Sequence, residues 1–170
     1  MTARASVLGS LHSVDGTGVV RMEHRFDTGI DDLWGALTKP DRLARWYGEA
    51  EGDLAPGGEF RLRIALSGER LGRVEACEPP RHLVLAMRDP EARPGQPEQT
   101  VIEAWLTAED AQTGLVWETR GLPVDLLPAY GAGIQIHVEH LAEYVAGGEF
   151  RLDDARWDEL FAAYEAAGVS

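Results

Sequence analysis

The sequence predicts an α+β fold in which a curved antiparallel sheet wraps around one long helix near the C-terminus. Two observations predict this class. Apolar and polar residues alternate with the period of half-buried strands between about residues 60 and 119, and a segment with helical periodicity follows. Two short helical segments separate this run from a single earlier strand, so strands and helices occupy different parts of the chain, as in α+β folds.

The first predicted strand runs from about residue 19 to residue 26, where apolar residues alternate with charged ones. Apolar residues then recur at helical spacing between residues 30 and 37. Pro40 ends this helix and opens a second, shorter helical turn. Residues 1–17 are small, polar and rich in glycine, and we expect them to form a flexible leader.

The later elements follow from the same two periods. An apolar stripe at helical spacing predicts a long helix over residues 128–146, and a last amphipathic helix is predicted over residues 153–167. Turns rich in glycine and proline separate the strands before these helices. These strands are predicted at residues 60–66, 71–77, 82–87, 101–106 and 115–119.

Composition excludes several classes of function. The 170 residues include 16 basic and 29 acidic side chains, a net charge of −13, which argues against binding to nucleic acid because phosphates need a basic surface. The chain contains no apolar run near the ~18 residues of a membrane span, so no membrane insertion is expected. Cys77 is the single cysteine, and the lack of an internal disulfide favours a reducing, cytoplasmic location.

Several segments resemble one known family. They occur in the family's order and are residues 34–40 (WGALTKP), 56–60 (PGGEF), 72–83 (GRVEACEPPRHL), 121–123 (GLP) and 157–160 (WDEL). Together they resemble the bacterial homologues of the activator of heat shock protein 90 ATPase, within the START-like helix-grip superfamily (SRPBCC). The resemblance covers roughly residues 19–164.

The resemblance implies a sheet of about seven strands that grips the C-terminal helix around an apolar cavity. From the residue patterns and the resemblance together, we expect a leader at 1–17, a helix-grip domain at 18–150 and a C-terminal amphipathic helix at 151–170 that packs on the domain. Met87 and Ile134 stand where the family often has tryptophan. We expect these two shorter side chains to leave a roomier pocket, unless Trp117 or Trp105 fills the space.

Strand and helix parity, together with the resemblance, predict the residues that line this cavity. His24 shares a strand face with apolar neighbours, so it points inward as a ligand-orienting group, as a weak candidate for a base, or as a core histidine with a satisfied hydrogen bond. His137, on the long helix, is a second candidate to orient a ligand. The full predicted set is Met22, His24, Phe60, Leu62, Ile64, Leu85, Met87, Leu115, Trp117, Ile134, His137, Val138 and Leu141.

Three functions remain open at this level. The first is binding of a small hydrophobic molecule without covalent chemistry. The second is a chaperone-associated interaction module, which would bind a protein partner or a second copy of the chain. The third is a polyketide cyclase-like enzyme with His24 as its base. No cofactor is expected, and the five histidines lack the spacing of a metal site, so no metal is expected either.

Overall fold

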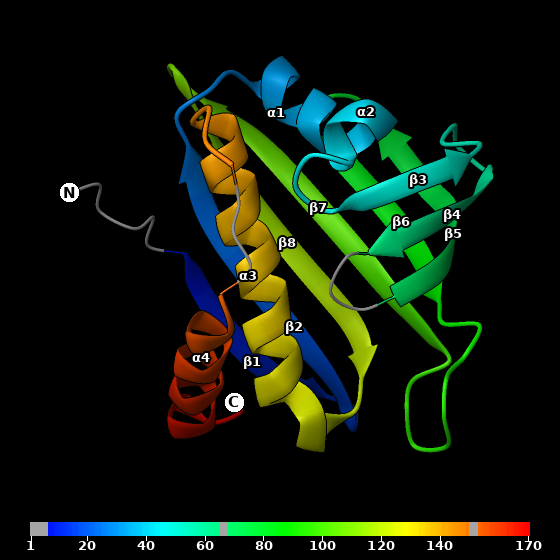
Figure 1. The fold of residues 1–170 in the computed structure, drawn as a ribbon, viewed down its shortest axis with the longest axis vertical. Coiled ribbons are helices and arrows are strands. Elements are labelled where there is room, and N and C mark those ends of the chain that lie inside the picture. The colour runs from blue at the N-terminus through cyan, green and yellow to red at the C-terminus, as the bar shows by residue number, and fades with distance from the viewer. Residues whose placement is uncertain (1–6, 65–67, 150–152) are drawn as a thin grey trace.

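The computed structural model describes residues 7–64, 68–149 and 153–170. Within these residues the chain forms one eight-stranded antiparallel sheet with the order β1-β2-β8-β7-β6-β5-β4-β3 (Figure 1). The strands are β1 (Leu8–Val14), β2 (Thr17–Phe26), β3 (Gly48–Gly52), β4 (Glu59–Ile64), β5 (Gly68–Glu78), β6 (His82–Arg88), β7 (Gln99–Glu109) and β8 (Gln112–Leu122). The helices are α1 (Ile30–Thr38), α2 (Pro40–Leu43), the short 3-10 turn η1 (Val124–Leu126), α3 (Leu127–Val145) and α4 (Asp154–Ala167).

The predicted fold class is confirmed: one open antiparallel sheet, two short helices after the first strands and a long helix near the C-terminus. Both ends of the long helix lie within one residue of the prediction. Strand β4 ends at Ile64, and residues 65 and 66 of the predicted strand lie outside the described part of the chain.

The expectation of a flexible leader is wrong for residues 8–17. Residues 8–14 form β1, which pairs with β2 along its whole length, and residues 1–6 lie outside the described range. The sequence does not indicate this strand because only Leu11 places a large buried side chain on its inner face. Tertiary pairing therefore decides the structure of this segment. Strand β3, with the sequence GEAEG, escaped prediction for the same reason.

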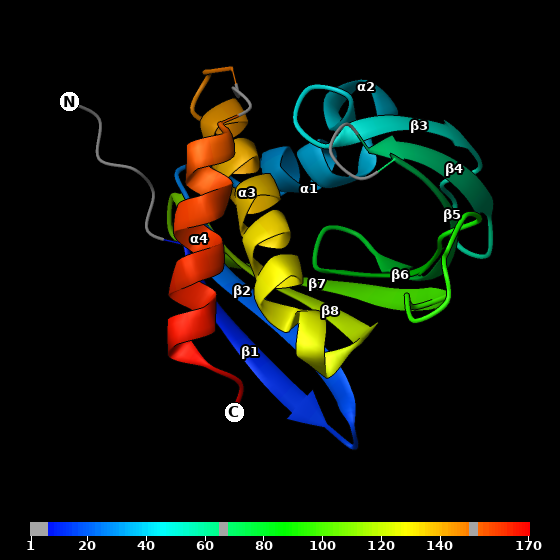
Figure 2. The same cartoon turned by 60° about the horizontal axis from the view of Figure 1, so that its bottom comes forward.

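Helices α3 and α4 lie side by side on one face of the sheet (Figures 1 and 2). Tyr164 of α4 joins them, because its hydroxyl donates a 2.5 Å hydrogen bond to Gln135 Oε1 of α3 and lies 3.5 Å from the sulfur of Met22. Gly9 of β1 makes room for that hydroxyl, since a Cβ at this position would lie 1.7 Å from it. At the C-terminus, the backbone of Ser170 hydrogen-bonds to β1. Its N–H donates to the carbonyl of Leu11, and its carbonyl accepts from the N–H of Ser13.

The core consists of two apolar clusters. The larger one packs α1, α3 and α4 against β1, β2, β7 and β8, whereas the smaller one fills the curl formed by β4, β5 and β6. Trp34, Tyr47 and Ile102 contact both clusters and so join them. Trp46 is fixed beside them because its indole N–H donates to the carbonyl of Ala36 at 2.8 Å.

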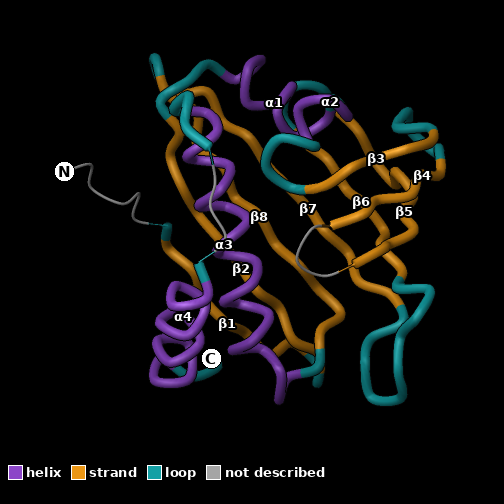
Figure 3. Tube along the Cα trace, in the orientation of Figure 1, coloured by secondary structure: helices purple, strands orange, loops and turns teal. Residues whose placement is uncertain are grey.

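The long helix covers only part of the sheet. Helix α3 packs against β1 and β2, while α1 and α2 lie at one end, near β3 and β7. Figure 3 shows α3 and α4 over the half of the sheet that holds β1 and β2, with β3–β6 extending to the other side. None of the described helices is long and apolar enough to cross a bilayer.

A Gly9→Ala variant tests the packing of α4 against β1. We expect it to lower the free energy of unfolding by about 2 kcal/mol, because the added Cβ overlaps the Tyr164 hydroxyl and approaches the Met22 sulfur at 2.8 Å. Urea denaturation measures this change. In a Tyr164→Phe background the cost should be smaller, because the hydroxyl is gone. Equal costs in both backgrounds would contradict this packing.

Candidate functional site

A pocket of about 440 Å³ lies between α3 and the part of the sheet that α3 leaves uncovered. Its floor comes from β7 and β8, one wall from α3, and the opposite wall from β4, β5 and β6. The start of α4 and the loop between β6 and β7 form its rim. The apolar and aromatic residues that line it are Tyr47, Ile64, Met87, Pro97, Ile102, Trp117, Leu122, Ala129, Tyr130, Ile134, Ile136 and Trp157.

Three rings meet on one side of the pocket. The ring of Tyr47 lies edge-on to that of His137, with 4.7 Å between their centroids, and 6.0 Å from that of Trp117. The indole N–H of Trp117 donates to Thr119 Oγ1 at 3.0 Å, which holds the indole against the floor. Burial raises the pKa of Tyr47 to about 12, and the nearby Arg70 guanidinium opposes that shift, so the phenol stays protonated at neutral pH.

His137 is the buried polar group of this wall. Its side chain is 8% exposed, and its Nδ1 is buried without a hydrogen-bond partner among the described residues. Burial and, to a smaller extent, His140, whose ring centroid is 6.3 Å away, together lower the pKa of His137 to about 4. Burial also lowers the pKa of His140. Both imidazoles are therefore neutral at pH 7.

The rim of the pocket carries charged groups. Arg70 and Asp89 face each other across 3.6 Å, and both side chains are partly exposed. Asp153 and Asp154 lie at the start of α4, where the Asp153 carboxylate accepts hydrogen bonds from two backbone N–H groups of the first turn. Trp157 lies next to them and stacks on Phe161 with 5.0 Å between ring centroids. The charged residues of the lining are thus partly or fully exposed, whereas most of the remaining lining is apolar or aromatic.

A smaller, apolar cavity of about 80 Å³ lies inside the second core cluster. It shares Tyr47, Met87, Ile102 and Trp117 with the larger pocket, so these four side chains separate the two spaces. Cys77 lines the smaller cavity, and burial raises the pKa of its thiol, which keeps the thiol protonated.

The structure brings together part of the predicted set. Met87, Trp117, Ile134, His137 and Ile64 line the larger pocket, while Phe60, Leu62 and Leu85 line the smaller one. Both positions at which the family often has tryptophan, Met87 and Ile134, therefore border the larger space.

Five predicted residues line neither space: Met22, His24, Leu115, Val138 and Leu141. The correction has a physical reason. Met22, Leu115, Val138 and Leu141 lie where α3 packs directly on the sheet, so they are at most 2% exposed and belong to the core. His24 is half-buried and packs edge-on against Phe26 at 4.7 Å, outside both spaces. It is therefore not placed to act on a molecule in the pocket.

Sequence reasoning missed several lining residues. Thr119 lies on the same face of β8 as Trp117, and Ile102 on the same face of β7 as Ala104. The alternation of the strands could therefore have predicted both residues. Tyr47, Tyr130 and Trp157 carry no such signal. They come from the segment between α2 and β3, the start of α3 and the start of α4, and only tertiary packing brings them to the pocket.

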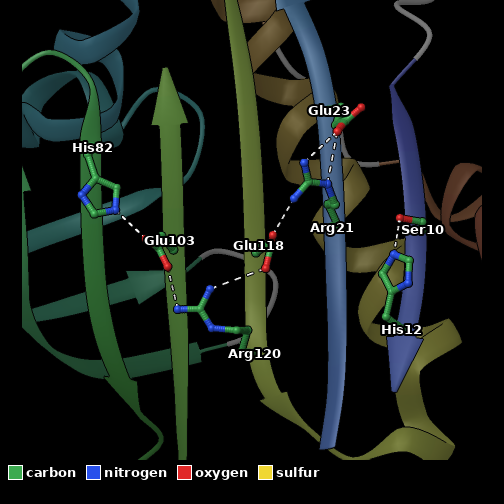
Figure 4. Close-up of polar contacts among 8 residues, drawn as sticks. All are labelled: Ser10, His12, Arg21, Glu23, His82, Glu103, Glu118 and Arg120. Carbon is green, nitrogen blue, oxygen red and sulfur yellow. Dashed lines mark hydrogen bonds and ion pairs between the residues drawn. The ribbon is translucent and has the colours of Figure 1, made fainter. Parts of the chain in front are cut away.

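The opposite face of the sheet carries a row of charged side chains (Figure 4). Glu103 binds His82 at 2.5 Å and Arg120 at 2.7 Å, and the row continues across β8 and β2 to Glu118 and Arg21. Burial is the largest influence on Glu103 and raises its pKa, but the hydrogen bonds from His82 and Arg120 together lower it. Because Glu103 and the pocket lie on opposite faces, this row takes no part in the pocket.

Metal binding has no support in the described residues, where no group of three or more histidine, cysteine, aspartate or glutamate side chains could hold an ion.

The model of the family described as "Activator of Hsp90 ATPase homolog 1-like protein" matches residues 27–146. The chain belongs to this family. The match spans α1 to the end of α3 and so includes most residues of the pocket. No curated protein matched the chain.

Solved structures support the helix-grip fold of this Hsp90 ATPase activator-like chain. It is similar to CalU16 from Micromonospora echinospora, with 26% identity, 95% of this chain and 97% of that chain covered, and a TM-score of 0.75. A protein encoded by BPP1335 of Bordetella parapertussis shares 22% identity over 100% of this chain and 97% of its own, with a TM-score of 0.70. DynU16, from the dynemicin biosynthetic locus, shares 23% identity over 77% of this chain and 48% of its own, with a TM-score of 0.69.

The buried histidines predict that this family member loses stability in acid. The native state holds His137 and His140 neutral, while the unfolded chain takes up protons below pH 6.5, so stability is full above that pH and falls as the pH drops toward 4. For His137 alone the loss across this window is on the order of 3 kcal/mol.

Urea denaturation at a series of pH values measures this loss. Between pH 6.5 and 5, the free energy of unfolding of His137→Phe should change less steeply with pH than that of the original chain. Carboxylates contribute little to the pH dependence in this window. A variant slope equal to that of the original chain would contradict the assignment.

Proposed function

We propose that this protein binds a small, largely apolar molecule in the pocket between α3 and the sheet. The observation that carries the proposal is the pocket itself: about 440 Å³ and lined mostly by apolar and aromatic side chains, with four charged residues that are partly or fully exposed. Its volume is within the ~300–1,000 Å³ of sites for small organic ligands. Membership of a family with the helix-grip fold supports the same function.

The polar groups inside the pocket favour binding over proton transfer. His137 is a weak base at neutral pH because its pKa is about 4, and the Tyr47 phenol stays protonated because its pKa is about 12. Neither group has a pKa near 7, where general acid–base catalysis at neutral pH is most effective. His24, the base that the sequence predicted for a cyclase-like reaction, lies outside the pocket.

Thermal denaturation in the presence of uncharged aromatic and aliphatic compounds tests this function. A compound present at ~100 times its dissociation constant should stabilise the protein by about 2.7 kcal/mol. We expect hits among neutral compounds with a flat or compact apolar body. A cooperative melt that no compound shifts would contradict the proposal.

An Ile134→Trp variant locates the binding. The larger side chain fills space between α3 and the floor, so it should abolish ligand-induced stabilisation while the unliganded protein melts at the same or a higher temperature. His24→Ala is the matched control, and we expect it to keep ligand binding because His24 lines neither space. Loss of binding in His24→Ala, with Ile134→Trp unaffected, would place the ligand elsewhere.

A further inference from the structure

The unpaired nitrogen of His137 determines which hydrogen-bonding group this side chain can offer. A neutral imidazole carries its proton on one nitrogen and a lone pair on the other. Nδ1 is buried and has no hydrogen-bond partner within the described chain, while the residue itself lines the pocket. Two arrangements are open: a buried Nδ1–H with no acceptor, or a buried Nδ1 lone pair with the proton on Nε2.

The second arrangement costs less free energy. Buried N–H donors without an acceptor are the rarer defect in proteins, whereas buried acceptors that lack a donor are tolerated more often. The tautomer of a histidine is set by what its other nitrogen contacts, and here nothing accepts a proton from Nδ1. The proton therefore belongs on Nε2, which is the ring nitrogen left to interact with a molecule in the pocket that His137 lines.

The surroundings of His137 keep this donor uncharged. The Tyr47 ring packs edge-on against the imidazole at 4.7 Å, and His140 follows one helical turn later. Among the described residues, no hydrogen bond or ion pair joins His137 to a carboxylate, and the acidic residues that line the pocket are Asp89, Asp153 and Asp154. Nearby, the Trp117 N–H is already used by Thr119.

We propose that His137 selects, through its Nε2–H, an uncharged ligand whose carbonyl-type oxygen accepts a hydrogen bond while its flat apolar body packs on Tyr47 and Trp117. This inference rests on the proposed function and adds the chemical class of the ligand. An ammonium group could not accept this hydrogen bond, and a purely hydrocarbon ligand would leave the donor unpaired. Because unpaired buried donors are unfavourable, the difference between acceptor and hydrocarbon ligands should be measurable.

Two probes of matched shape test the inference. 2-Acetylnaphthalene carries a carbonyl group, and 2-isopropenylnaphthalene replaces its C=O by C=CH2. Calorimetric titration should give a dissociation constant roughly five- to tenfold lower for the ketone, the effect of about one hydrogen bond. The carbonyl ¹³C resonance of the bound ketone should move downfield.

Variants assign the effect to His137. His137→Phe keeps a ring but removes the donor, so the two probes should bind equally. His137→Gln places an amide N–H near the position of Nε2 and should restore part of the preference for the ketone. His140→Phe is the matched control on the same helix, because His140 is buried but does not line the pocket, and it should keep the full preference.

A ligand-free measurement tests the proton position separately. In protein labelled with ¹⁵N-histidine, the nitrogen shifts of His137 should show a neutral ring protonated on Nε2 between pH 6 and 8. Protonation of Nδ1 would overturn the inference, and so would equal affinity for the two probes, although in that case the proposed function would stand. Failure of both probes to bind would overturn the proposed function together with the inference.

Discussion

The structure depends on one geometric constraint: a single helix cannot cover an eight-stranded sheet. Helix α3 has 19 residues and is therefore about 28 Å long and ~10 Å wide, whereas eight strands spaced by ~4.8 Å span about 34 Å. The chain extends the cover with α4, which lies beside α3, and with α1 and α2 at one end. Strands β3–β6 curve back toward the helices (Figure 2). The pocket lies between these strands and α3.

Tyr47 is the side chain that connects the two core clusters and the pocket. It contacts both core clusters, separates the larger pocket from the smaller cavity and packs against His137. The pocket therefore shares its walls with the core rather than lying on the surface. A consequence is that His137 is buried with a nitrogen unsatisfied, which stabilises nothing in the folded chain itself. The proposed ligand would pair with the other ring nitrogen, Nε2, so the buried Nδ1 determines the tautomer and does not itself bind the ligand.

Local patterns predicted much of the fold but less of the site. Alternation located β2, β4 and the strands that follow, because each of them buries one face and exposes the other. The same alternation could not locate β1, whose glycine at position 9 reflects contact with Tyr164 some 150 residues later in the chain. Strand parity predicted that Met22 and His24 share a face of β2. Parity cannot predict whether a helix or a pocket covers a residue on that face.

The sequence by itself determined the class of fold and the order of its main elements, because periodicity is a local property. Only the tertiary structure decided which inward-facing residues form the core and which form the pocket. That choice depends on where α3 crosses the sheet, and its position is set by contacts such as Tyr164 with Gln135 between residues far apart in sequence. His24 therefore packs beside Phe26 outside the pocket, and His137 lines it.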